Sequence, residues 1–70
     1  MPRKIRQLKG DLQRAGFTLM RGRGKGSHTV WEHPDAPGLS VTLAGQDGDD
    51  AKRYQEREVR ATIANAMQER

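Results

Sequence analysis

The sequence predicts a single α+β domain over residues 1–70, in which a three-stranded antiparallel sheet carries both helices on one face. Two segments near the chain ends have apolar residues at helical spacing, and three short segments between them alternate apolar and polar residues. The predicted order is therefore α-β-β-β-α. Because each element has one apolar face, both helices must cover the same side of the sheet to bury their stripes.

The first helix is expected from about Lys4 to Ala15. Its buried face would consist of apolar residues three or four positions apart: Ile5, Leu8, Leu12 and Ala15. Gly16 follows them, and a glycine readily takes the left-handed conformation that ends a helix.

Three strands are expected next, at residues 17–21, 28–33 and 39–43. The second is ended by the turn-forming run 34–38, which contains two prolines and a glycine. The alternation places Phe17 and Leu19 on one side of the first strand, and Leu39, Val41 and Leu43 on one side of a half-buried third strand. Trp31 is expected in the core as well, with an exposed platform for stacking a nucleobase as the alternative.

The second helix is expected to run to about Gln68, after a loop at residues 45–50. The last aspartates of that loop, Asp49 and Asp50, are expected to cap this helix and to lie favourably at its positive end. Its apolar stripe would consist of Ala51, Tyr54, Val59, Ile63, Ala66 and Met67.

Charge is distributed unevenly along the chain. The net charge is +4, but residues 1–28 hold eight basic residues against one acidic residue, whereas residues 29–70 hold five against eight. The first part is therefore attractive to polyanions, and phosphate backbones are the first candidates. The alternative is a solvated basic helix that contributes only to solubility.

The chain has no cysteine, which excludes disulfide bonds, thiolate zinc sites and a cysteine nucleophile. This composition suits a reducing compartment, and a cytoplasmic location is expected. No more than two apolar residues follow one another, so neither a membrane-spanning helix nor the apolar part of a signal peptide is expected.

Residues 21–28, Arg-Gly-Arg-Gly-Lys-Gly-Ser-His, form the most informative segment. Its glycines let backbone N–H groups turn toward an anion, and the cations Arg21, Arg23 and Lys25 would neutralise that anion. The spacing of a nucleotide-binding P-loop is absent, and the segment precedes a strand rather than a helix, which excludes that motif. An ordinary hairpin connection would use the same residue types.

His28 is the side chain of this segment that can exchange a proton near neutral pH. Beside a basic loop it could take the proton from an RNA 2′-hydroxyl or give one to the departing 5′-oxygen, and this chemistry needs no metal. A surface histidine in a hairpin is the alternative. His33 is expected to point to the opposite face of the strand, so the two histidines would form neither a metal pair nor an acid and base pair.

Taken together, this pattern resembles the HicA family of bacterial toxins. The residues that carry the resemblance are Gly16-Phe17, Gly26-Ser27-His28, Trp31 and His33-Pro34. The resemblance implies a fold similar to a double-stranded RNA-binding domain, cleavage of mRNA without a metal or other cofactor, a single catalytic histidine at His28, and neutralisation by a HicB-type antitoxin. The residues expected to hold the RNA are Lys9, Arg21, Arg23, Lys25, Gly26 and Ser27.

Two features depart from the family pattern. Residues 22–25 include a short insertion, and the segment 42–45 has no proline and no second histidine after the third strand. Two other functions remain open at this point. One is a non-catalytic RNA-binding module of the same fold, which would hold RNA by shape and phosphate contacts. The other is an interaction subunit whose histidine is incidental.

Overall fold

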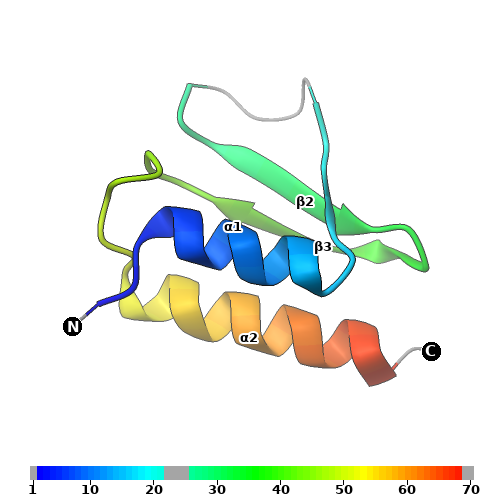
Figure 1. Cartoon of the computed structure of the whole chain (residues 1–70). Helices are drawn as coiled ribbons and strands as arrows, with labels where there is room; N and C mark the ends of the chain where they lie inside the picture. Colours follow the sequence, from blue (N-terminus) through cyan, green and yellow to red (C-terminus); the bar gives the residue numbers. More distant parts are fainter. Residues whose placement is uncertain (1, 22–25, 69–70) are drawn as a thin grey trace.

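The computed structural model of the chain describes residues 2–21 and 26–68. Two helices lie side by side on one face of a three-stranded antiparallel sheet, as Figure 1 shows, and the strand order is β1-β2-β3. The elements in chain order are α1 (Ile5–Arg14), β1 (Thr18–Leu19), β2 (Thr29–His33), β3 (Ala36–Leu43) and α2 (Arg53–Gln68). The predicted α+β class and the order α-β-β-β-α are confirmed.

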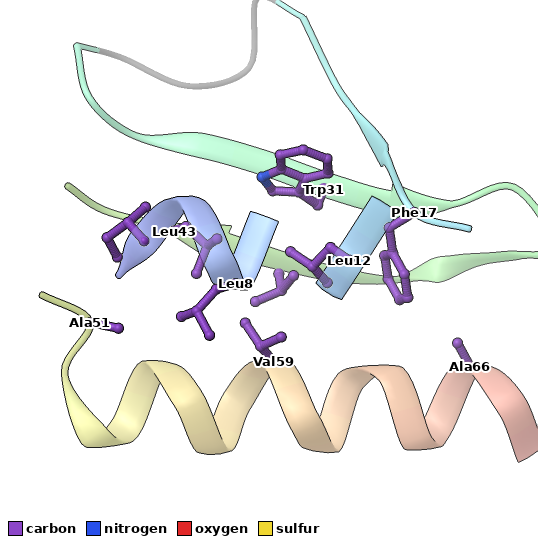
Figure 2. Packing of buried hydrophobic residues seen from close by; sticks show 10 residues of the cluster. Leu8, Leu12, Phe17, Trp31, Leu43, Ala51, Val59 and Ala66 are labelled. Carbon is purple, nitrogen blue, oxygen red and sulfur yellow. The ribbon is translucent and has the colours of Figure 1, made fainter. Parts of the chain in front are cut away.

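The core lies between the sheet and the two helices, and α1 supplies its centre. Leu8 and Leu12 of α1 are fully buried, with Trp31 of β2 on one side and Val59 of α2 on the other (Figure 2). Burying a leucine side chain stabilises a fold by about 1.5–3 kcal/mol, so α1 is held mainly by this packing. Gly16 ends α1 with a φ of 95°, as the sequence predicted.

The β2–β3 hairpin differs from the sequence prediction in the length of its turn. Only Pro34 and Asp35 form the turn, and β3 already begins at Ala36. The register shifts between Glu32, which is paired with Ser40, and His33, which is paired with Ala36. The residues expected in a long turn therefore form a bulge in β3, because a proline cannot donate to a strand ladder but fits a bulge.

Leu19 lies on the same side of the sheet as Phe17, as the alternation predicts, but it is not buried. It pairs with Trp31 and so lies on the helix side of the sheet, yet it is 46% exposed. The reason is its position in β1, a two-residue strand at the edge of the sheet. The other four inward-facing residues are buried or half-buried: Phe17, Leu39, Val41 and Leu43.

The apolar stripe of α2 also differs from the prediction. Tyr54 is 53% exposed and Met67 is 68% exposed. The buried positions of this helix are Gln55, Val59, Thr62 and Ala66. Gln55 takes a core position because both ends of its amide are paired: its Nε2 donates to the Ala44 carbonyl at 2.9 Å, and its Oε1 accepts from the Lys52 backbone N–H at 2.8 Å.

The expected capping of α2 by the loop aspartates is wrong, because that loop caps the other helix. The backbone N–H of Ile5 donates to the Asp49 carbonyl at 2.9 Å, and that of Arg6 donates to the Asp47 carbonyl at 3.2 Å. These bonds satisfy two of the N–H groups that the start of a helix leaves open. The start of α2 is instead capped by the Gln55 side chain on Lys52. No helix in the described part of the chain is long and apolar enough to cross a membrane.

Candidate nucleic-acid interface and histidine site

His28 lies immediately before β2 and is exposed. Trp31 is buried toward the helices, so the strand alternation places Val30, and His28 two residues before it, toward the helix-free face of the sheet. The histidine that the sequence analysis singled out is therefore exposed, at the end of the sheet where the β1–β2 connection joins β2.

Arg21 is brought to the same end of the sheet by strand pairing. β1 and β2 are antiparallel, with Leu19 opposite Trp31, and the Met20 backbone N–H donates to the Val30 carbonyl at 2.8 Å. Extending this register by two residues beyond Leu19 and Trp31 sets Arg21 opposite Thr29, the neighbour of His28. Arg21 is exposed, so its guanidinium is accessible from solvent at this end of the sheet.

Gly26 and Ser27 form an exposed turn that leads directly into His28. The φ of Gly26 is 59°, a left-handed conformation that favours glycine. No atom lies within 4 Å of the position where a Cβ would stand on Gly26, so conformation rather than space calls for glycine here. The expected RNA contacts Arg23 and Lys25 lie outside the described residues.

Lys9 is not part of this end of the sheet. It belongs to α1, where its Nζ donates to the Asp47 carboxylate at 2.6 Å. The expected RNA-binding residues thus separate into two groups. Arg21, Gly26 and Ser27 adjoin His28, whereas Lys9 is paired with the loop that caps α1.

The basic side of α1 is largely neutralised within the protein. Four of its cations, including those just outside the helix, form ion pairs: Arg3 and Arg14 with Asp11, Lys4 with Asp50, and Lys9 with Asp47. Exposed pairs of this kind stabilise a protein by less than about 1 kcal/mol, so a phosphate can compete for the cations. Even so, the free positive charge on α1 is smaller than the sequence suggests.

Asp11 shows how these pairs act on ionisation. Partial burial opposes its charged form, but hydrogen bonds from Arg3 and Arg14 outweigh that effect, and the pKa of Asp11 lies below its ordinary value. The hydrogen bond with Asp11 in turn raises the pKa of Arg3. Both groups are therefore charged in the folded protein at neutral pH.

His33 has a structural position. It is 3% exposed and meets the Phe17 ring edge to face, with the ring centroids 5.2 Å apart. Its Nδ1 accepts a hydrogen bond from the Asp35 backbone N–H at 3.1 Å, so the neutral ring carries its proton on Nε2. A buried His33 and an exposed His28 do not converge, as the sequence analysis expected.

Trp31 is a core residue, which rules out its use as an exposed stacking platform. It is 3% exposed, and its indole Nε1 donates to the Thr29 hydroxyl at 3.0 Å. This bond satisfies the polar end of a buried tryptophan. Any stacking of nucleobases would have to use other side chains.

The sequence analysis missed the polar face that adjoins His28. Val30 and Glu32 of β2 lie on the helix-free face of the sheet, as do the residues paired with them on β1 and β3. Three of these paired residues are exposed and carry a hydroxyl: Thr18, Ser40 and Thr42. The alternation of Leu39, Val41 and Leu43 with polar residues was a signal for this face. These hydroxyls could hydrogen-bond a polar polymer that runs past His28.

A hollow with a volume of about 270 Å³ lies where both helices end, and it is lined by His33 rather than His28. An open surface at His28 suits a long polymer better than a small enclosed ligand. In the described residues, no three metal-ligating side chains come together as a group that could hold a metal ion.

Comparison with known protein families gives a match that covers most of the chain. The model of a family described as "HicA toxin of bacterial toxin-antitoxin" matches residues 5–66. The match runs from the first residue of α1 to Ala66 in the last turn of α2, so it includes the whole sheet and His28. No match was found among curated proteins or solved structures.

Proposed function

The chain belongs to the HicA toxin family, and on that premise we propose that this toxin is a metal-independent endoribonuclease that cleaves mRNA with His28 as its single catalytic histidine. The observation that supports the proposal most directly is the position of His28. It is exposed, it follows a glycine turn, and it adjoins Arg21 at one end of the sheet.

The reaction needs one proton transfer at each of two oxygens. The RNA 2′-oxygen attacks the adjacent phosphorus, the bond from phosphorus to the 5′-oxygen breaks, and a 2′,3′-cyclic phosphate and a free 5′-hydroxyl result. His28 would act as the general base that takes the 2′-hydroxyl proton, or as the general acid that protonates the 5′-oxygen, and water would serve the other oxygen. A cation beside it stabilises the extra negative charge on the phosphate.

RNA binding is proposed for the residues around His28. Arg21 and the Gly26-Ser27 turn support this by their place at the same end of the sheet, and Arg23 and Lys25 by their place in the sequence. Lys9 would contribute only where a phosphate displaces Asp47 from it.

The test is incubation of the purified protein with a long mRNA, with and without EDTA. We expect cleavage that EDTA leaves unchanged, with 2′,3′-cyclic phosphate ends. His28→Gln should lower the rate by about 10²–10⁴-fold, because that is the usual contribution of a general acid or base. The thermal unfolding midpoint should be unchanged, since His28 is exposed.

Two results would overturn the catalytic assignment. One is equal cleavage by a well-folded His28→Gln variant. The other is binding of RNA without cleavage by the parent protein, which would point to a non-catalytic RNA-binding module.

Membership of the family also implies a cognate antitoxin. We propose a HicB-type protein that covers His28 and blocks RNA at the same time. The ion pairs along α1 support contact at the His28 end rather than along this helix, because most cations of α1 already have an acidic partner.

A further inference from the structure

The outer edge of β3 carries no charge, proline or bulge along its second half, residues 40–43, and the side chain of Gln55 covers only the Ala44 carbonyl just beyond it. β3 is the last strand of the sheet, and its eight residues carry no charge in a chain of which 31% of residues are charged. Native edge strands are protected against pairing by charges, prolines or bulges. Here Pro37 and the bulge protect only the part before Ser40.

The strand pairing shows which backbone groups of β3 face outward. The Met20 N–H donates to the Val30 carbonyl, so the backbone groups of Val30 point toward β1. Because successive residues of a strand point their backbone groups to opposite sides, the N–H and C=O groups of Trp31 point toward β3 and face those of its partner Val41. The N–H and C=O groups of Ser40 and Thr42 therefore point away from the sheet, at its open edge.

The residue types of this segment are arranged symmetrically about Val41. It reads Leu39-Ser40-Val41-Thr42-Leu43, with an apolar centre, a hydroxyl residue on each side and a leucine at each end. In an antiparallel pair related by a two-fold axis at Val41, leucine lies opposite leucine and Ser40 lies opposite Thr42. Like side chains thus meet on each face, and matched cross-strand pairs stabilise a sheet.

We propose that β3 pairs with β3 of a second copy of this chain, antiparallel and centred on Val41, to form a symmetric dimer with a continuous six-stranded sheet. Ser40 of one copy and Thr42 of the other exchange both N–H···O=C bonds, and these are the residues whose backbone groups face outward. A two-fold interface of this kind is self-complementary and closes at two subunits.

The two-fold axis is perpendicular to the sheet, so the helices of both copies lie on the same side. One flank of α2 faces α1, where Glu56, Arg60 and Ile63 line a hollow between the helices. Helical spacing places Tyr54, Glu58, Ala61 and Asn65 on the opposite flank, toward the open edge. Ala61 is exposed and small, whereas Glu58 is exposed and charged, so the proposed pairing rests on the strands and not on contact between the two copies of α2.

This dimer leaves the proposed ribonuclease site open. His28 precedes β2, the central strand, and is placed toward the helix-free face of the sheet, whereas the pairing uses the backbone groups on the outer edge of β3. The inference therefore does not depend on the proposed function, and its test does not need cleavage of RNA.

The first test uses proline to remove one outward N–H group. Thr42→Pro removes a donor at the dimer edge and leaves the hydrogen bonds between β2 and β3 in place. Leu19→Pro is the matched control, because Leu19 precedes Met20 and its N–H points away from the sheet at the opposite edge. Sedimentation equilibrium should show a concentration-dependent dimer for the parent and for Leu19→Pro. For Thr42→Pro the dissociation constant should rise at least about tenfold, since two equivalent bonds are lost.

The second test reads the register with cysteines in a chain that has none of its own. Ser40→Cys and Thr42→Cys chains are mixed and oxidised. In the proposed register the two substituted positions lie directly opposite each other, within reach of a disulfide, whereas in the Ser40→Cys variant alone the two thiols of a dimer are diagonal neighbours and too far apart. We expect a cross-linked dimer from the mixture and little from either variant alone.

The proposal is overturned by a parent chain that stays monomeric at the highest concentration reached. It is also overturned by a dimer that Thr42→Pro leaves intact, or by cross-linking that is equal in the mixture and in the single variants. Circular dichroism of each variant separates loss of pairing from loss of folding.

Discussion

At the scale of single residues, two histidines of one short segment have opposite surroundings. His33 is enclosed between Phe17 and the hairpin turn and accepts a backbone N–H, whereas His28 is exposed. A buried ring held by a hydrogen bond stabilises the fold. The exposed one is accessible for exchange of protons with a substrate.

Arg21 should contribute to RNA affinity through its charge. We expect Arg21→Gln to weaken binding and to lower the slope of log K against log salt by about 0.7, the value for one phosphate contact with a single strand. The matched control is Arg57→Gln, which removes an exposed arginine of α2. Fluorescence anisotropy with 2′-O-methyl RNA measures binding without cleavage, because that RNA has no 2′-hydroxyl. A slope lowered equally by both variants would contradict a specific role for Arg21.

Asp11 should make part of the stability depend on pH. Its pKa in the folded protein lies below the ordinary value of 3.8, mainly because the hydrogen bonds from Arg3 and Arg14 outweigh the effect of burial. The stabilisation is therefore fully present above that ordinary value and is lost as the pH falls through the lower, folded pKa. Asp11→Asn should be less stable at neutral pH by about 1 kcal/mol or less per pair.

Thermal unfolding followed from neutral to acidic pH measures this effect. The difference in thermal unfolding midpoint between the parent and Asp11→Asn should shrink as the pH falls through the pKa of Asp11 in the folded protein. A difference that stays constant would show that the ion pairs of Asp11 do not contribute.

At the scale of elements, the start of α2 depends on a buried glutamine. Gln55→Ala removes the cap on the Lys52 N–H and leaves the Ala44 carbonyl without its partner. The loss should be about 1–3 kcal/mol, the cost of unpaired buried polar groups. Urea unfolding measures it, with Gln13→Ala as control, because Gln13 is exposed on α1. An equal effect of both substitutions would contradict the role of Gln55.

The elements also show how far the sequence could predict this fold. The regular spacing along α1 and the alternation along β3 predicted their type and their buried residues, because each element has one apolar face. The stripe of α2 was predicted less well, since a buried Gln55 depends on the Lys52 and Ala44 backbone groups that satisfy it. Local patterns do not contain such contacts between segments.

The same limit applies to the site. The composition of residues 21–28 predicts a histidine beside a basic loop, and the structure shows that this histidine is exposed, while its role stays a prediction. The pairing of Lys9 with Asp47 joins residues that are far apart in the chain. That contact follows from the fold and could not be predicted from the basic helix itself.

At the scale of the whole molecule, the charge map favours one end of the sheet for antitoxin contact. Hydrogen exchange on binding of the cognate antitoxin should show protection at residues 26–31, and little change on the exposed side of α2. A partner that binds only the folded toxin raises its free energy of unfolding by about 2.7 kcal/mol when the partner is present at a hundred times its dissociation constant. The complex should therefore melt well above the free toxin.

The His28→Gln variant suits this measurement, because it separates binding from toxicity. Protection confined to residues 50–68, with none at the His28 end, would contradict direct occlusion. It would indicate an antitoxin that binds α2 and inhibits without covering His28.

The capping of α1 by residues 47–49 has a consequence for the order of events during synthesis. The first helix leaves the ribosome early, but the carbonyls that complete its start belong to the last third of the chain, as does Val59, which covers its far side. Contacts between distant segments form late, after the entropy of closing a long loop has been overcome. A nascent or prematurely terminated chain therefore has an incomplete first helix and an uncovered core. This domain gains its folded surface only after residues 47–59 have been translated.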